Sequence, residues 1–264
     1  MITAELQRVD ADVVCLQEVW TDVDEVASPV APRVEILGPG DTEVAMSETA
    51  RLAEACGYGD HRFSWRYAHE GVAFGNAILT RWPIASVVAL PLPTVAGFEE
   101  HRTVLLVHVD TPEGLLPVAT THLNFRWDQG DIRCLQVDST CRFLAEHADR
   151  RDLPVVLTGD MNAESSSDEM RRLTGRAPVP VRDLGFLDAW EVGGRGDGHT
   201  WTRQNTHAAQ ISTEADRRID YVYVGYPDLT SRRGLITSAE RFGMTATDGM
   251  HPTDHFGVVA DLAT

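Results

Sequence analysis

The sequence predicts a layered α/β protein in which residues 1–264 form one domain, since no internal repeat, low-complexity tract or linker divides them. Apolar runs of strand length recur along the chain. The runs between residues 63 and 121 are closely spaced, which favours antiparallel pairing. An amphipathic helical pattern over residues 129–148 then leads into the apolar run 154–157, so helices and strands belong to one fold.

The N-terminal half begins with a helix and a strand. Residues 1–9 resemble the end of a short helix, and residues 11–20 form a near-continuous apolar run, typical of a strand buried on both faces. Residues 21–45 are rich in proline, glycine and aspartate and predict an exposed loop. A short helix is expected over residues 46–56, where Gly57 ends it. The strands expected next are residues 63–67, 75–84, 86–90, 103–109 and 115–121.

The C-terminal half contains the strand 154–157 after the long helix, followed by smaller elements. Ser166 and Glu169 have the spacing of a capping box, which predicts a short helix that Gly175 and Pro178 end. The remaining expected elements are a short segment at 184–190, a brief strand at 200–202, a loop at 203–215, a strong strand at 217–224 and a final strand within 252–262.

The charge balance excludes several kinds of chemistry. The chain carries 23 basic and 40 acidic residues, a net charge of −17. An even negative field repels polyanions, so nucleic acid is a disfavoured partner unless a local basic groove exists. All basic residues are arginine, which excludes Schiff-base lysines, lysine general bases and a P-loop lysine. The groove would need to combine Arg126, Arg171, Arg172, Arg217 and Arg218, although paired arginines are more often solvated surface.

The cysteines predict the compartment. Cys15, Cys56, Cys134 and Cys141 match no zinc-ligand spacing. Cys134 and Cys141 lie on one helical stripe, and we interpret them as small core residues. A reducing, cytoplasmic location is therefore expected. No apolar run has the length of a membrane span, and Met1 is not followed by a signal-peptide pattern.

The most informative stretch for function is Thr158-Gly159-Asp160-Met161-Asn162, which follows the buried strand 154–157. Period-two alternation places Asp160 and Asn162 on the same side if the strand continues that far. An acid and an amide at the mouth of a buried strand suit a hydrated cation, a water nucleophile or a phosphate oxygen. The alternative is an Asp/Asn turn that closes the strand.

Other strands also carry polar residues at or near their ends. Glu18 interrupts the first apolar run, where a carboxylate needs a metal or a partner unless the strand has already ended and Glu18 is solvated. His122 ends the strand 115–121, where it either donates hydrogen bonds or is plain polar surface. Asp220 lies within the strand 217–224, and an acid–histidine pair, Asp254-His255, begins the last strand. Strand ends on one edge of a layered fold meet in a single cleft, so we expect these side chains to converge.

These residues lie within motifs that resemble those of the endonuclease/exonuclease/phosphatase superfamily, in the order that family has them. The motifs are Leu16-Gln17-Glu18, Gly75-Asn76-Ala77-Ile78-Leu79, Thr121-His122-Leu123-Asn124, Gly159-Asp160-Met161-Asn162, Arg218-Ile219-Asp220-Tyr221 and Thr253-Asp254-His255. The resemblance implies a four-layer α/β/β/α sandwich of two mixed, mainly antiparallel β-sheets flanked by helices. It also implies hydrolysis of a phosphoester or phosphodiester by activated water, with magnesium, or manganese as the alternative ion.

The resemblance also assigns roles. Glu18 resembles the principal metal carboxylate, Asp254 a second and indirect metal contact, and Asp160 the residue that orients or deprotonates the attacking water. Magnesium prefers oxygen ligands and keeps several waters, so one or two carboxylates suffice to bind it.

The remaining motif residues resemble groups that contact the phosphate. Asn162 and His255 are similar to donors to the phosphate oxygens, and Asp220 is similar to the partner that keeps His255 charged. His122 is similar to a donor to the phosphate or the leaving group. A phosphoester transition state gathers negative charge on its non-bridging oxygens, which such donors stabilise.

One departure from the family pattern concerns the start of the chain. Family members open with a strand that carries an Asn at the site, and here Met1 already lies in the following helix. Losing three or four buried side chains costs on the order of 5–10 kcal/mol, against a total stability of about 5–15 kcal/mol. We therefore expect the true start to lie upstream of Met1.

The substrate class stays open at the level of sequence. Nucleic acids, phosphoinositides, phospholipids and other phosphoesters all occur in the superfamily, and no amphipathic membrane helix supports a lipid substrate here. Endonuclease or exonuclease action on nucleic acid is one alternative. A catalytically impaired binding protein of the same fold is another. The sequence gives no oligomeric state.

Overall fold

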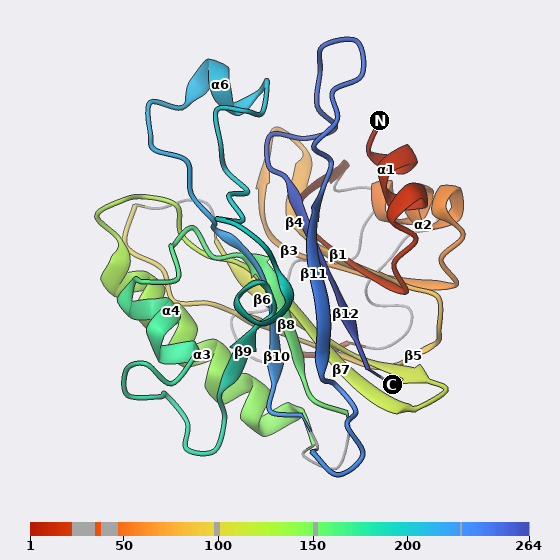
Figure 1. The fold of residues 1–264 in the computed structure, drawn as a ribbon, viewed down its shortest axis with the longest axis vertical. Coiled ribbons are helices and arrows are strands. Elements are labelled where there is room, and N and C mark those ends of the chain that lie inside the picture. The colour runs from red at the N-terminus through yellow and green to blue at the C-terminus, as the bar shows by residue number, and fades with distance from the viewer. Residues whose placement is uncertain (23–34, 38–46, 98–100, 150–152, 228, 264) are drawn as a thin grey trace.

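The chain folds into packed β-sheets with helices on their outer faces, as the computed structural model shows (Figure 1). The structure describes residues 1–22, 35–37, 47–97, 101–149, 153–227 and 229–263. Most of the loop predicted over residues 21–45 lies outside these ranges, and the described part differs from the prediction, because residues 21–22 end one strand and residues 35–37 form another.

The larger sheet has seven strands in the order β2-β5-β6-β7-β8-β10-β9. Its strands are β2 (Glu35–Leu37), β5 (Ile84–Pro91), β6 (Thr103–Thr111), β7 (Gly114–His122), β8 (Val156–Asp160), β9 (Phe186–Asp188) and β10 (Asp220–Gly225). β7 and β8 are parallel, and the other described pairs of this sheet are antiparallel. The parallel pair requires a crossover, which helix α3 (Gly130–His147) provides.

The second sheet is made of β1 (Val13–Asp22), β4 (Val72–Thr80) and β3 (Asp60–His69), in that order. Its described pairs are all antiparallel, so only the larger sheet is mixed. Two further strands, β11 (Ile236–Phe242) and β12 (Gly257–Leu262), pair with each other. No element was predicted where β11 lies, and β11 is only partly buried.

Three apolar clusters hold the layers together. Helices α1 (Ile2–Val9) and α2 (Glu48–Cys56) cover the β1-β4-β3 sheet through Leu6 and Leu52. Helices α3 and α4 (Asp168–Leu173) cover the seven-stranded sheet through Leu144 and Met170. The third cluster, which includes Ile78, joins β4 to β5, β6 and β7 between the two sheets. The predicted α/β/β/α sandwich is therefore confirmed.

Several short elements differ from the sequence-based expectation. The loop at 203–215 contains helix α6 (Ala208–Ile211), and helix α5 (Ala189–Gly193) follows β9 directly. The predicted capping box is wrong. Ser167 is the N-cap of α4, its side chain makes no capping hydrogen bond, and Glu169 instead pairs with Arg133 of α3. By contrast, Gly57 ends α2 in the left-handed conformation, as predicted.

A cavity of about 400 Å³ lies beside β1 and β12 and also reaches β8 and β10. Among the described strands, β1 pairs only with β4 and β12 only with β11, so both face the cavity with an open edge. Val13, Cys15, Val258 and Ala260 line it and are half-buried. The first apolar run was expected to be buried on both faces, whereas Val13 and Cys15 are only half-buried beside this cavity.

Two further expectations concern the cysteines and a membrane-spanning segment. All four cysteines are free thiols, and Cys141 is buried in the cluster under α3. None of the described helices is both long and apolar enough to cross a membrane.

Candidate active site

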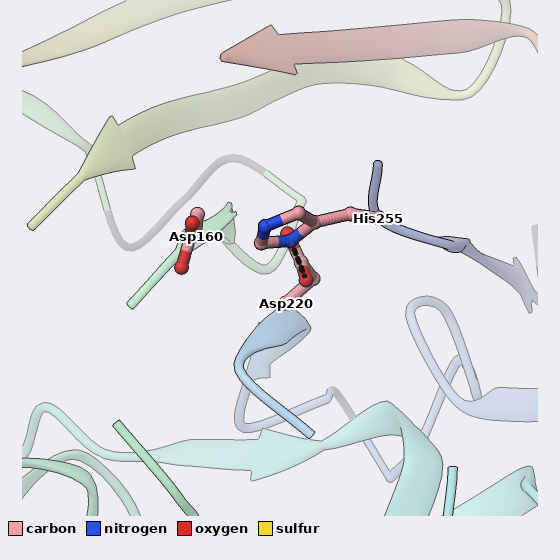
Figure 2. Close-up of side chains that lie close together, drawn as sticks. All are labelled: Asp160, Asp220 and His255. Atoms are coloured by element: carbon pink, nitrogen blue, oxygen red, sulfur yellow. Dashed lines mark hydrogen bonds and ion pairs between the residues drawn. The ribbon is translucent and has the colours of Figure 1, made fainter. Parts of the chain in front are cut away.

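Three strand ends meet at one edge of the seven-stranded sheet. In the parallel pair β7–β8, His122 lies opposite Asp160, and in the antiparallel pair β8–β10, Asp160 lies opposite Asp220. Because parallel strands end at the same edge and an antiparallel neighbour begins there, strand register alone puts these three residues side by side. Figure 2 shows Asp160 and Asp220 facing His255, which comes from the segment before β12.

The backbone just before Asp160 lies very close to the neighbouring strand β7. Gly159 has φ +150°, and a Cβ atom there would clash with the carbonyl oxygen of Thr121 on β7. Asn162 has φ +51°, and this left-handed turn lets its backbone N–H donate to Asp160 Oδ1 at 2.8 Å. The turn therefore holds the acid and the amide on one side, and its positive φ angles account for the Gly-x-x-Asn spacing.

Asp160, Asp220 and His255 form a charged cluster in which one ligand atom from each lies within 4.8 Å of the others. His255 Nδ1 lies 2.8 Å from Asp220 Oδ2 (Figure 2). Burial disfavours the imidazolium form, but the charge and hydrogen bond of Asp220, with the charges of Asp160 and Asp254, outweigh it and raise the pKa of His255 to about 10. Burial, together with the nearby Asp220 charge, raises the pKa of Asp160 to about 7.

His122 is neutral, in contrast to the charged His255. It is 4% exposed, and burial, followed by the Arg102 charge, lowers its pKa well below the usual value. Its Nε2 lies 3.0 Å from Asn162 Nδ2 and 3.5 Å from Asp160 Oδ2. A neutral imidazole carries one N–H, so His122 can donate one hydrogen bond but has no second proton to give away.

Arg102 was not among the predicted residues. Its Nη1 lies 3.1 Å from His122 Nδ1, and the residue is 5% exposed. Arg102 immediately precedes β6, the neighbour of β7, so strand pairing brings it beside His122. The only signal in the sequence was a basic residue at the start of a buried strand.

Glu18 lies on a β-bulge, because the β1–β4 register shifts between Leu16 and Val19. It has φ +54° and a side chain that is 51% exposed, with Oε1 3.7 Å from His122 Nδ1. The expectation of a carboxylate buried in a continuous strand is therefore wrong. The strand continues past Glu18, but the bulge turns its side chain out toward the site. Gln17, the other bulge residue, donates to Thr120 Oγ1 of β7 and ties the two sheets together.

Asp254 is half-buried and accepts a hydrogen bond from Thr253 Oγ1 at 3.1 Å. Its charge contributes to the raised pKa of His255. The seven predicted side chains are thus linked by contacts and charge at one edge of the fold. The links run from Glu18 through His122 to Asp160 and Asn162, and from Asp160 through Asp220 and His255 to Asp254.

The carboxylates fit a divalent cation. Asp220 and Glu18 both raise the pKa of Asp160, so three acids lie close together at this site, while the charge of His255 lowers that pKa. Oxygen donors of this kind match the preference of magnesium or manganese. Asp220 favours the charged form of His255, and an imidazolium has no lone pair to give a metal, so this histidine is a poor metal ligand.

The basic groove considered from the sequence does not form as a free cationic surface. Four of its arginines pair with acids of this chain: Arg171 with Asp168, Arg172 with Asp138, Arg217 with Glu214 and Arg218 with Asp188. The Arg218–Asp188 pair is buried and belongs to the core rather than to a binding surface.

Comparison with known proteins gives an independent view of the chain. A family model described as "Endonuclease/Exonuclease/phosphatase family" matches residues 1–255. The chain is 27% identical to Protein angel of Drosophila melanogaster over 213 residues, covering 76% of this chain and 53% of that protein. It is 26% identical to Carbon catabolite repressor protein 4 homolog 2 of Arabidopsis thaliana over 194 residues, covering 67% of this chain and 30% of that protein. The chain thus spans about half the length of the first relative and less than a third of the second.

Solved structures share the fold. TDP2 of D. rerio, solved with a single-strand DNA product, has a TM-score of 0.71 and 20% identity, covering 100% of this chain and 90% of that one. The human Nocturnin catalytic domain, solved with a bound sulfate anion, has a TM-score of 0.66 and 18% identity, covering 99% and 84%.

Proposed function

Because the chain belongs to the endonuclease/exonuclease/phosphatase family, we propose that it is a hydrolase that cleaves a phosphodiester bond by attack of an activated water. The observation that supports this proposal is a pair of neighbouring groups at one edge of the seven-stranded sheet. They are Asp160, with a pKa of about 7, and a charged His255. A general base works best when its pKa is near the operating pH, and a developing phosphate charge needs fixed cationic donors.

In this proposal Asp160 orients the water and accepts its proton. Asn162 follows on the same turn, and its Nδ2 faces His122 Nε2 and the Leu123 carbonyl oxygen, so it exchanges one of these contacts to donate to a phosphate oxygen. His255 uses Nδ1 to hold Asp220, which leaves Nε2–H to donate to a second phosphate oxygen. Asp220 acts through His255 and is a positioning residue.

His122 stays neutral and donates a single hydrogen bond to the phosphate or to the leaving-group oxygen. Arg102 beside its Nδ1 disfavours a second proton there. Arginine and the amide nitrogen of Asn162 only donate, and they face Nδ1 and Nε2 respectively, so neither ring nitrogen favours an additional proton. We therefore prefer the hydrogen-bond donor role of His122 over transfer of a proton from an imidazolium.

A divalent cation, magnesium by preference and manganese as the alternative, would be held by Glu18, with Asp254 as a second and indirect contact. The ion supplies positive charge that offsets the charge developing on the phosphate. The exposure of Glu18 on its bulge suits an ion that keeps several of its waters.

The test is hydrolysis of bis(p-nitrophenyl) phosphate, a phosphodiester, in magnesium, in manganese and in EDTA. We expect metal-dependent release of nitrophenol, abolished by EDTA, and slower release from the monoester p-nitrophenyl phosphate. Asp160→Ala, His255→Ala and Glu18→Ala should each lose most activity while they keep the wild-type circular dichroism spectrum. The matched control is His69→Ala, because His69 is an exposed histidine at the end of β3. A flat result in every metal would favour the binding-protein alternative.

A further inference from the structure

An exposed tryptophan near the site is fixed in one orientation. Trp127 is 68% exposed, yet its Nε1–H donates to Glu214 Oε1 at 3.0 Å. The guanidinium of Arg217 lies over its ring, 4.7 Å from the ring centroid, and also pairs with Glu214. The three side chains thus form a closed set, which we call the Trp127 clamp. A large aromatic ring that is fixed yet exposed has already lost its side-chain conformational freedom. A ligand that binds to it therefore does not bear that entropic cost.

The clamp lies on segments that also lead to the two site histidines. Trp127 lies in the segment between β7 and α3, five positions after His122. Arg217 pairs through its backbone with Trp201, and the Trp201 ring lies 4.9 Å from the His255 ring, centroid to centroid. The clamp therefore belongs to the surroundings of the site, on segments that leave β7 and lead into β10.

The charge of the clamp favours a flat, weakly charged ligand group. Arg217 is balanced by Glu214, so the clamp offers little net attraction for a phosphate. Its open surface is the indole ring, which suits another flat ring by stacking. Stacking of this kind is how proteins bind unpaired bases without reading their sequence. It also agrees with a chain of net charge −17, which cannot rely on long-range attraction to a polyanion.

Resting on the proposed hydrolase function, we propose that Trp127 is the platform on which an unpaired nucleobase next to the scissile phosphodiester stacks. The substrate class is then a short single-stranded nucleic acid. Bases within a duplex already stack on each other and would have to be unpaired first, which adds a cost of a few kcal/mol. Both DNA and RNA carry such a base, and the experiment separates the two.

The experiment compares substrates with and without the base. Cleavage of pentathymidylate, of pentauridylate and of a fully abasic pentamer with the same deoxyribose-phosphate backbone is followed by mass spectrometry in magnesium, with no attached dye. We expect the wild type to show a KM for the abasic pentamer about tenfold higher than for pentathymidylate, within the range for loss of one base–aromatic stack. Trp127→Leu should raise KM for pentathymidylate about tenfold and leave KM for the abasic pentamer unchanged. Trp127→Phe, which keeps a ring, should stay near the wild type.

The controls separate this proposal from the hydrolase function. Leu135→Ala removes an exposed apolar side chain from α3 and should change no KM. Hydrolysis of bis(p-nitrophenyl) phosphate without cleavage of pentathymidylate or pentauridylate would overturn the nucleobase proposal and leave the hydrolase function standing. Loss of activity on every phosphodiester would overturn both. Equal effects of Trp127→Leu on normal and abasic pentamers would also overturn the proposal, since the ring would then not contact a base.

Discussion

Replacing Asp160 by Asn should stabilise the protein while it removes activity, because the site holds a carboxylate where folding alone disfavours one. Asp160 is 6% exposed, and burial raises its pKa from 3.8 to about 7. A raised folded-state pKa means that the group contributes stability below pH 3.8, which is lost as the pH rises through about 7.

The magnitude follows from the pKa difference. One pKa unit corresponds to about 1.4 kcal/mol, so keeping Asp160 ionised at pH 8 costs the folded state about 4 kcal/mol. Asn has nearly the same shape, keeps an oxygen for the Asn162 N–H and carries no charge. We therefore expect Asp160→Asn to raise the free energy of unfolding by up to about 4 kcal/mol at pH 8, and by close to nothing at pH 4.

The assay is urea unfolding of wild type and Asp160→Asn in EDTA at several values between pH 4 and pH 8, with turnover measured separately in magnesium. Turnover should fall by about 10²–10⁴-fold, the usual contribution of a general base. Asp110→Asn is the matched control, since Asp110 is exposed on β6, and it should change neither stability nor turnover. A variant that is no more stable than wild type at pH 8, or a stability difference that does not vary with pH, would refute the reasoning.

Three further predictions follow from the same contacts. Asp220→Asn removes the charge that holds the His255 pKa near 10, so the NMR titration of His255 should move to lower pH, and an unchanged midpoint would exclude Asp220 as the cause. Glu18→Gln should raise the magnesium concentration that gives half-maximal activity and leave the melting temperature unchanged, since the side chain is 51% exposed; equal magnesium dependence would remove Glu18 as the metal carboxylate. Gly159→Ala places a Cβ against the Thr121 carbonyl at φ +150°, and should cost about 2–4 kcal/mol in chemical unfolding, whereas Gly97→Ala, with open space around it, should cost less.

The layered fold and the convergence of the site residues were accessible from the sequence. Strand-length apolar runs that end in Asp160 and His122 place polar groups at one sheet edge whatever the details of the connections. Asp220 was expected within the strand 217–224, whereas it begins β10 and so lies at the same edge. The link is physical, since pairing two buried strands in register fixes where both of them end.

Other features depend on contacts that no local pattern reports. The bulge that exposes Glu18 depends on the register between β1 and β4, and strand spacing in the sequence does not show that register. Arg102 reaches His122 only because β6 and β7 pair. The capping-box spacing at Ser166 failed because Glu169 has a stronger partner in Arg133, on a helix 36 residues away in sequence. β11 was missed because a half-buried strand lacks a continuous apolar run.

The most direct test of the proposed chemistry is the pH dependence of kcat/KM for bis(p-nitrophenyl) phosphate at saturating magnesium. Activity requires ionised Asp160 together with protonated His255, whose pKa values lie at about 7 and about 10. The account predicts a bell-shaped profile, with an acidic limb at or below pH 7 because a nearby cation favours the carboxylate, and a basic limb near pH 10. A basic limb that is absent, or that stays unchanged in Asp220→Asn, would contradict it.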